Sequence, residues 1–204
     1  MPIILDGTNG GFFPSWTTAT RPASPAVGQM GYNTTTGLFD MYTASGWVSS
    51  LTGASQSIPK SALPTGSVLQ VVQGSYTGAV STSSTSFVTT NLTASITPSS
   101  SSSKILIMVS GGDCYSQTTN KVMRTTIYRN NSTNLATGGA NPCFGNGYNS
   151  AGGVTTVHTY SFLDSPATTS STSYTVYMSA ETGAVSNYNQ NGTTSYIQLM
   201  EIAA

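Results

Sequence analysis

Runs in which apolar and polar residues alternate recur along this chain, and this period of two constrains its fold more than any other feature. One run would place five residues on the same face of a strand: Val88, Thr90, Leu92, Ala94 and Ile96. Asn91 is expected to interrupt that strand. The same alternation marks residues 123–128, 154–162 and 173–180, and no apolar stripe has helical spacing. We therefore expect an all-β chain.

Three further runs complete the set of expected strands. Residues 68–76 and 196–202 are rich in residues that fit a pleated sheet. Residues 104–109 are almost continuously apolar, which is typical of a strand covered on both faces. About seven or eight strands within residues 67–204 suit an antiparallel β-sandwich of the jelly-roll type. The strand order stays open at this point.

Charged residues are rare. Asp, Glu, Lys and Arg make up 6% of the 204 residues and the net charge is zero, whereas about a quarter is usual. A chain without a basic patch lacks the main source of affinity for phosphates, so we expect no nucleic-acid partner. No apolar run approaches the roughly 20 residues that span a bilayer, so we expect no membrane insertion. Hydrophobic residues still form 37% of the chain, which favours a folded core over disorder.

The chain is organised as a small N-terminal segment, a linker and a larger domain. Residues 1–50 contain short apolar stretches between Gly-containing turns, typical of a small β-hairpin or extended attachment segment that needs a partner surface. A short β-meander is expected within it, at residues 29–33, 38–42 and 46–48. Residues 51–66 are small, polar and interrupted by proline, as in a linker. The β-sandwich head then covers residues 67–204.

Residues that carry chemistry are few and scattered. His158 is the single histidine and lies six positions before Asp164, which separates them by about 20 Å along a straight strand. No Gly-x-Ser-x-Gly motif accompanies them, and the six acidic residues show no glycosidase-like pairing in the sequence. The residues that could form a zinc site are Asp113, Cys114, Cys143 and His158. Their positions do not show the close sequence spacing that is typical of zinc ligands. We expect no enzyme activity, catalytic residue, metal or cofactor, and two free thiols.

Two segments, residues 141–149 and 187–192, place aromatic rings among amides. Rings pack on the apolar faces of sugars, and amides hydrogen-bond sugar hydroxyls. These segments are expected on loops and supply the candidate residues for binding a glycan or receptor: Phe144, Tyr148, Asn149, Tyr188, Asn189 and Asn191. Because Asn and Gly are also the residues that tight turns require, turn formation is the alternative explanation.

Several stretches resemble virion fibre and decoration proteins of tailed bacteriophages, especially those of marine and cyanobacterial phages. In the N-terminal part these are TATRPASP (18–25), VGQMGYNT (27–34) and GWV (46–48). In the C-terminal part they are ITPS (96–99), SKILI (103–107), FLDSP (162–166) and LMEI (199–202). The first group is similar to a small module near the ends of phage structural proteins, and the second to the C-terminal globular domain of such fibres.

The resemblance implies a homotrimer located in the virion and assembled in the host cytoplasm. Its N-terminal segment would bind other virion proteins, of the capsid or the tail, and its β-sandwich head would face outward, where it could contact a host-surface glycan. The chain has neither heptads nor a sustained repeat of the kind that builds a long shaft. This favours a short fibre or spike over a long tail fibre.

Apolar residues near the N-terminus are the expected anchor to the particle, because exposed aromatic clusters usually mark an interface. They are Ile3, Ile4, Leu5, Phe12, Phe13 and Trp16. Two other functions remain open. A capsid decoration protein would stabilise the shell, and a soluble carbohydrate-binding module would bind sugars as a monomer.

Overall fold

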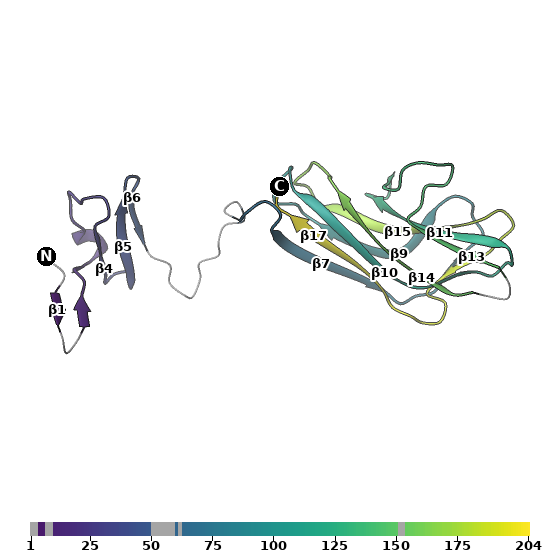
Figure 1. Cartoon of the computed structure of the whole chain (residues 1–204), viewed down its shortest axis with the longest axis horizontal. Coiled ribbons are helices and arrows are strands. Elements are labelled where there is room, and N and C mark those ends of the chain that lie inside the picture. The colour runs from purple at the N-terminus through teal and green to yellow at the C-terminus, as the bar shows by residue number, and fades with distance from the viewer. Residues whose placement is uncertain (1–3, 7–9, 50–59, 61–62, 151–153) are drawn as a thin grey trace. The chain divides into compact units, whose positions relative to one another are not determined.

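The chain forms two compact units, residues Met1–Ile58 and Pro59–Ala204 (Figure 1). The structure, a computed structural model, describes residues 4–6, 10–49, 60, 63–150 and 154–204. The two units divide within the expected linker, residues 51–66, of which only 60 and 63–66 are among the described residues. That last part folds with the larger unit, since the Gly66 N–H donates to the Ala203 carbonyl at 2.8 Å.

The N-terminal unit is a small β-structure. A two-stranded antiparallel ladder joins β1 (Ile4–Asp6) to β2 (Gly10–Phe12). A separate sheet has the order β3 (Ser15–Trp16), β4 (Met30–Asn33), β5 (Leu38–Thr43) and β6 (Gly46–Ser49). The expected β-meander is confirmed by β4, β5 and β6, whereas β3 adds a parallel edge strand that short-range sequence patterns do not reveal. A 3-10 turn, η1 (Thr18–Thr20), follows β3.

The larger unit, the head, consists of two antiparallel sheets. The first has the order β7 (Val68–Tyr76), β17 (Ser195–Ile202), β10 (Lys104–Ser116) and β14 (Thr156–Asp164). The second has the order β9 (Val88–Ile96), β15 (Thr172–Ala180), β11 (Lys121–Arg129) and β13 (Gly145–Asn149). Short strands extend them at β8 (Val80–Thr82), β12 (Thr133–Asn134) and β16 (Ser186–Tyr188).

The pairing of the eight main strands is nested. The first in sequence pairs with the last (β7 and β17), the second with the seventh (β9 and β15), the third with the sixth (β10 and β14), and the fourth with the fifth (β11 and β13). This nesting across two sheets is the topology of a jelly roll. The expected all-β antiparallel sandwich is confirmed, and the pairing supplies the strand order that the sequence left open.

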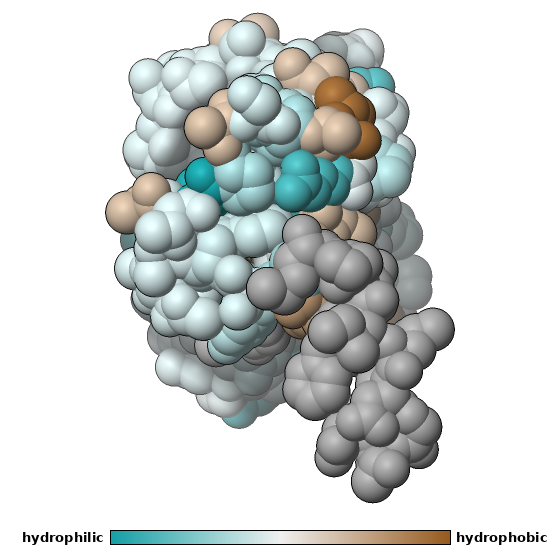
Figure 2. Space-filling view, turned by 90° about the vertical axis from the view of Figure 1, so that its left-hand side faces the viewer, coloured by the Kyte–Doolittle hydropathy of each residue, from teal (hydrophilic) through white to brown (hydrophobic). Residues whose placement is uncertain are grey.

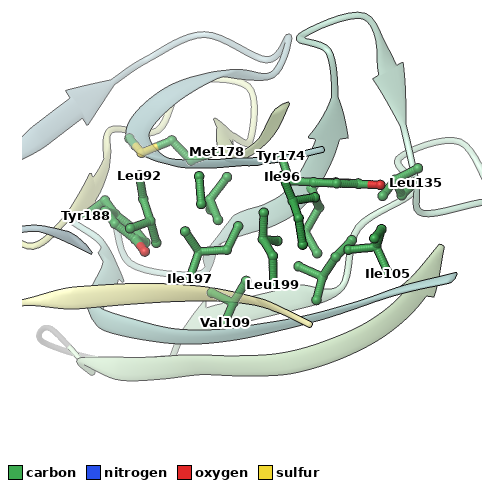
Figure 3. Packing of buried hydrophobic residues seen from close by; sticks show 14 of the residues in the cluster. Leu92, Ile96, Ile105, Val109, Leu135, Tyr174, Met178, Tyr188, Ile197 and Leu199 are labelled. Carbon is green, nitrogen blue, oxygen red and sulfur yellow. The ribbon is translucent and has the colours of Figure 1, made fainter. Parts of the chain in front are cut away.

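The core lies between the two sheets, and alternating side chains from both supply it (Figure 3). Leu92 and Ile96 from one sheet face Ile197 and Leu199 from the other, and all four are buried. The alternation read from the sequence therefore identifies the inner faces correctly. Asn91 does not end its strand: it adopts a left-handed backbone at φ 67°, and the ladder to β15 shifts register there. It forms a β-bulge, after which the alternation continues.

One expectation about β10 is wrong. Its apolar run at residues 104–109 was expected to be covered on both faces, but only Ile105, Ile107 and Val109 are buried. Leu106 is half-buried and Met108 is 41% exposed on the outer face. The reason is that the two-layer sandwich covers only the inner face of each sheet, so the second apolar face of β10 belongs to the surface of the head.

Candidate functional site

The acidic side chains that the structure describes each belong to a separate hydrogen-bond network. Asp113 accepts from Asn191 and Thr193, Asp164 from Arg129 and Tyr174, and Glu181 from Lys121. Asp40 and Glu201 are fully buried and accept from several donors each. These hydrogen bonds give each carboxylate a structural role, because each of them joins separate segments of the fold.

His158 and Asp164 both lie on β14, but each has partners of its own. The His158 Nδ1 lies 2.8 Å from Thr125 Oγ1, whereas Asp164 receives two hydrogen bonds of 2.9 Å from Arg129. The imidazole is buried beneath Gly145 and Gly147 of β13, where a Cβ on either glycine would crowd the ring. Burial lowers the pKa of His158 from 6.5 to about 4. It is therefore a neutral interior group at physiological pH.

His158 should make the head sensitive to mild acid. The pKa of His158 is lower in the folded chain than in the unfolded chain. Between these two pKa values the imidazole is protonated in the unfolded state but not in the folded state, so the free energy of unfolding decreases as the pH is lowered. The loss should approach about 3 kcal/mol between pH 6.5 and 4. Urea unfolding across this range should show the slope in the native chain and a flatter profile in His158→Gln. An equal slope in both proteins would assign the acid sensitivity to other groups.

Both cysteines are free thiols, as expected from the sequence. Burial raises the pKa of Cys114 to about 12 and also raises that of Cys143. Both thiols are therefore protonated and unreactive near neutral pH. Within the described ranges, no group of three or more His, Cys, Asp and Glu side chains is arranged to hold a metal ion.

The residues expected on glycan-binding loops separate into exposed and buried groups. Tyr148 is 53% exposed on β13, and Asn191 is exposed in the turn after β16. Phe144 is half-buried and stacks on Tyr160. The other three are buried and were placed wrongly on receptor-facing loops: Asn149, Tyr188 and Asn189. They are interior because β13 and β16 pair with neighbouring strands and the turn after β16 folds back onto Asp113, whose carbonyl accepts from the Asn189 N–H.

The residues expected to anchor the N-terminus also differ in their surroundings. Ile3 lies outside the described residues, and the side chains of Ile4, Leu5 and Phe12 are likewise not described. Phe13 is 44% exposed, and its ring lies edge-on to Phe39 at 5.1 Å. Trp16 is buried, and its Nε1 donates to Asp40 at 3.1 Å. The two described anchor candidates therefore lie in different surroundings, one exposed and one in the interior.

Exposed apolar side chains gather on one face of the N-terminal four-stranded sheet. Cross-strand partners share a face, and the register pairs Met30 with Met41, Met41 with Val48, and Tyr32 with Phe39. Together with the ring of Phe13 these residues form what we call the apolar sheet face: Phe13, Met30, Tyr32, Phe39, Met41 and Val48. Each is 36–45% exposed. The sequence signal for it was the alternation of Met30 and Tyr32 with Gly31 and Asn33, which the N-terminal anchor prediction did not use.

The opposite face of the same sheet is organised around Asp40. Its carboxylate accepts from Trp16 Nε1, Arg21 Nε, Asn33 Nδ2 and Ser49 Oγ at 2.8–3.1 Å. Burial by itself would raise the pKa of Asp40, but these four hydrogen bonds outweigh it and hold the pKa far below its usual range. The carboxylate therefore stays ionised and ties η1, β3, β4 and β6 to β5.

A hollow of about 780 Å³ lies on the outer face of the first sheet of the head. It is lined from β7, β17, β10 and β14, by Gln73, Gln198, Tyr196, Met108, Ser110, Thr159 and Ser161 among others. All of these side chains are uncharged. Its volume is in the range of roughly 300–1,000 Å³ that is usual for small-molecule sites.

Few charged residues are available to cover the surface, because Asp, Glu, Lys and Arg make up 6% of the chain. Figure 2 shows one face of the molecule, where pale and light-teal atoms predominate, with few deep-teal spots and a compact brown group. This is the appearance expected when Ser, Thr and Gly, rather than charged residues, cover a protein. Contacts made by such a surface depend on shape, hydrogen bonds and apolar area more than on long-range charge.

No helix in the described ranges has the length and apolar character needed to cross a bilayer. Comparison with protein families finds none that matches the chain, and no curated protein is significantly similar to it. Because these comparisons identify no relative, a function has to be inferred from the two surfaces described above, the apolar sheet face and the hollow of the head.

Proposed function

We propose that the chain is a structural protein of a tailed-bacteriophage virion: a short homotrimeric fibre or spike without enzymatic activity. Its N-terminal unit attaches to another virion protein, of the capsid or the tail, and its jelly-roll head contacts the host surface. The observation that carries this proposal is the apolar sheet face, which leaves six large apolar or aromatic side chains partly exposed on one side of a very small unit.

The composition of the apolar sheet face suits a protein interface. Aromatic residues and methionine are enriched in interfaces, and charged residues are depleted from their centres. Contiguous apolar patches on small units usually mark a contact with another protein. A small sheet also needs a surface to pack against before it becomes independently stable. Attachment to a larger virion protein would meet that need.

The head supports the proposal by analogy of fold. Jelly rolls occur in viral capsid and lectin domains, among other proteins. A fold of this kind serves many functions, so the analogy supports a virion or sugar-binding role without identifying it. The similarity of the ITPS, SKILI, FLDSP and LMEI stretches to phage fibre heads points in the same direction. The trimer follows from that resemblance, and symmetric copies would bury apolar surface that a single copy exposes.

Substitutions on the apolar sheet face test the attachment. The double variant Met30→Glu/Met41→Glu adds charge to adjacent, exposed positions without removing a buried side chain, so the unit should still fold. Incorporation into particles should fall by about tenfold or more, because two carboxylates would lose water at the contact. The measurement is the amount of the protein in purified particles, by quantitative immunoblot.

The matched control places the same charges on exposed polar positions of the same unit, as Thr36→Glu/Ser45→Glu. This control should be incorporated like the native chain. Equal incorporation of Met30→Glu/Met41→Glu would show that the apolar sheet face is not the attachment site. Deletion of residues 1–20 is a poorer test, because it removes Trp16 and with it a donor to Asp40.

The apolar sheet face would equally suit a capsid decoration protein that binds the shell. That function predicts that particles lacking the chain release their DNA at a lower temperature, whereas a fibre predicts unchanged heat stability and reduced adsorption to cells. The hollow in the head also suits a soluble carbohydrate-binding module. That function predicts a monomer that binds sugar and does not associate with particles.

A further inference from the structure

The hollow on the head is built from regular rows of side chains that cross four strands. One row is Gln73, Gln198, Met108 and Ser161, as the strand registers show. The next is Tyr196, Ser110 and Thr159, and Ser75 of β7 continues this row beyond the lining of the hollow. Adjacent strands are about 4.8 Å apart, and alternate residues along a strand about 7 Å apart. The rows therefore present hydrogen-bonding groups at a spacing comparable with the hydroxyls of neighbouring sugar residues.

The side chains in these rows are uncharged and include both hydrogen-bond donors and acceptors. Gln198 Nε2 donates to Gln73 Oε1 at 3.0 Å, which holds the two amides side by side. Ser110, Thr159 and Ser161 add hydroxyls that both donate and accept. Tyr196 is 40% exposed among them and supplies an aromatic ring to the lining. Sugars have this combination of hydroxyls and apolar ring faces.

We propose that this hollow binds an uncharged oligosaccharide, with Tyr196 as the stacking platform and the Gln73–Gln198 pair as the main hydrogen-bonding group. No lining side chain is charged, so an anionic sugar would gain no ion pair here. The inference rests on the proposed role of the head in host contact and identifies the class of ligand. It places the site on the sheet face, away from the loop residues named from the sequence.

A second copy of the chain is a poorer occupant of the hollow. In a trimer the copies meet head to tail, so a different surface of the second copy would have to project into the hollow and fill it, or packing contacts would be lost. The amides and hydroxyls would also need complementary partners in the second copy to offset the loss of water. A sugar supplies both the volume and the hydrogen-bonding groups.

The test uses the purified full chain and immobilised neutral oligosaccharides built from glucose, galactose, mannose or N-acetylglucosamine, with sialylated and sulfated sugars alongside. The native chain should bind at least one neutral sugar. Tyr196→Ala should raise the Kd by about tenfold or more, because the stacking ring is lost. Tyr196→Phe, which keeps the ring, should retain most of the affinity, and Gln198→Ala should weaken it. Circular dichroism confirms that each variant is folded.

Tyr148→Ala is the matched control, because Tyr148 is also an exposed tyrosine, at 53% against 40% for Tyr196, and lies in the predicted glycan segment. It should bind like the native chain. Four outcomes would overturn the inference: no neutral sugar in the panel binds, only charged sugars bind, Tyr148→Ala rather than Tyr196→Ala loses binding, or Tyr196→Ala dissociates the oligomer in light scattering.

The result can be separated from that for the proposed function. Sugar binding is measured without particles, and incorporation is measured without sugar. Tyr196→Ala should be incorporated normally, and Met30→Glu/Met41→Glu should bind sugar normally. If the native chain binds no sugar but its incorporation depends on the apolar sheet face, only the site in the head is overturned. If the native chain binds sugar as expected but Met30→Glu/Met41→Glu is incorporated normally, only the attachment surface is overturned.

Discussion

Replacing Asp40 by alanine should unfold the N-terminal unit while the head stays folded. The carboxylate is fully buried and accepts four hydrogen bonds, one of them from the Arg21 guanidinium. Removing one partner of a buried charged pair costs roughly 3–5 kcal/mol. A small domain has only about that much stability in total. Trp16, Arg21, Asn33 and Ser49 would all lose the acceptor that positions them.

Tryptophan fluorescence measures this effect selectively. The two tryptophans of the chain, Trp16 and Trp47, both lie in the N-terminal unit, with ring centroids 5.2 Å apart. Asp40→Ala should show the red-shifted emission of exposed indoles at a temperature where the native chain does not, with the far-ultraviolet signal of the head retained. The control is Glu181→Ala, which removes a partly exposed carboxylate from the head. Native-like emission from Asp40→Ala would show that the network is dispensable.

Glu201→Ala should produce the corresponding effect in the head. Glu201 is fully buried near the end of β17, and Oε1 accepts from the Ser99 N–H, the Ser99 hydroxyl and the Ser103 hydroxyl at 2.5–2.8 Å. Oε2 accepts from Gln70 Nε2 at 2.6 Å, and Lys60 Nζ lies 3.9 Å away. Loss of this carboxylate leaves the buried Ser103 hydroxyl, and the donors of Ser99 and Gln70, without their acceptor where β7, the β9–β10 turn and β17 meet. We expect a loss of roughly 3–5 kcal/mol.

Urea unfolding followed by circular dichroism tests this prediction, with Glu201→Gln as the matched variant. The glutamine keeps one oxygen for the three donors at Oε1, so its loss should be clearly smaller than that of Glu201→Ala. The pKa of Glu201 is about 2, because hydrogen bonds outweigh the opposing effect of burial. Its contribution is therefore complete above pH 4.5 and lost as the pH falls toward 2. Equal losses for Gln and Ala would show that charge, rather than hydrogen-bond acceptance, is what the site requires.

The two networks also include residues from the stretches on which the proposal of a phage protein partly rests. Arg21 and Asn33, from TATRPASP and VGQMGYNT, donate to Asp40. Ser99, from ITPS, and Ser103, from SKILI, donate to Glu201 of LMEI. Segments distant in the sequence are thus joined by buried carboxylates. In this structure the named residues of these stretches therefore have a structural role: they donate hydrogen bonds to a buried carboxylate.

The candidate surfaces were harder to predict than the fold. Tyr188 and Tyr148 occur in similar Asn- and Gly-rich segments, yet Tyr188 is 1% and Tyr148 53% exposed. The difference arises because β16 pairs with both β10 and β8, which brings Tyr188 into the core, whereas Tyr148 lies on the outer face of β13. Such pairings depend on segments far away along the chain, and local composition carries no signal for them.

The sequence by itself determined most of the long strands of the head, the meander and the inner faces of the alternating strands, because side-chain alternation is a local property of extended backbone. It placed β13 and β16 on loops instead. It also determined that the chain would depend on hydroxyl and amide contacts, since so few of its residues are charged. Only the tertiary structure decided the nested strand order, the apolar sheet face and the hollow of the head. The hollow needs Gln73, Met108, Ser161 and Gln198 in one row, and only long-range strand pairing can align residues from four distant segments.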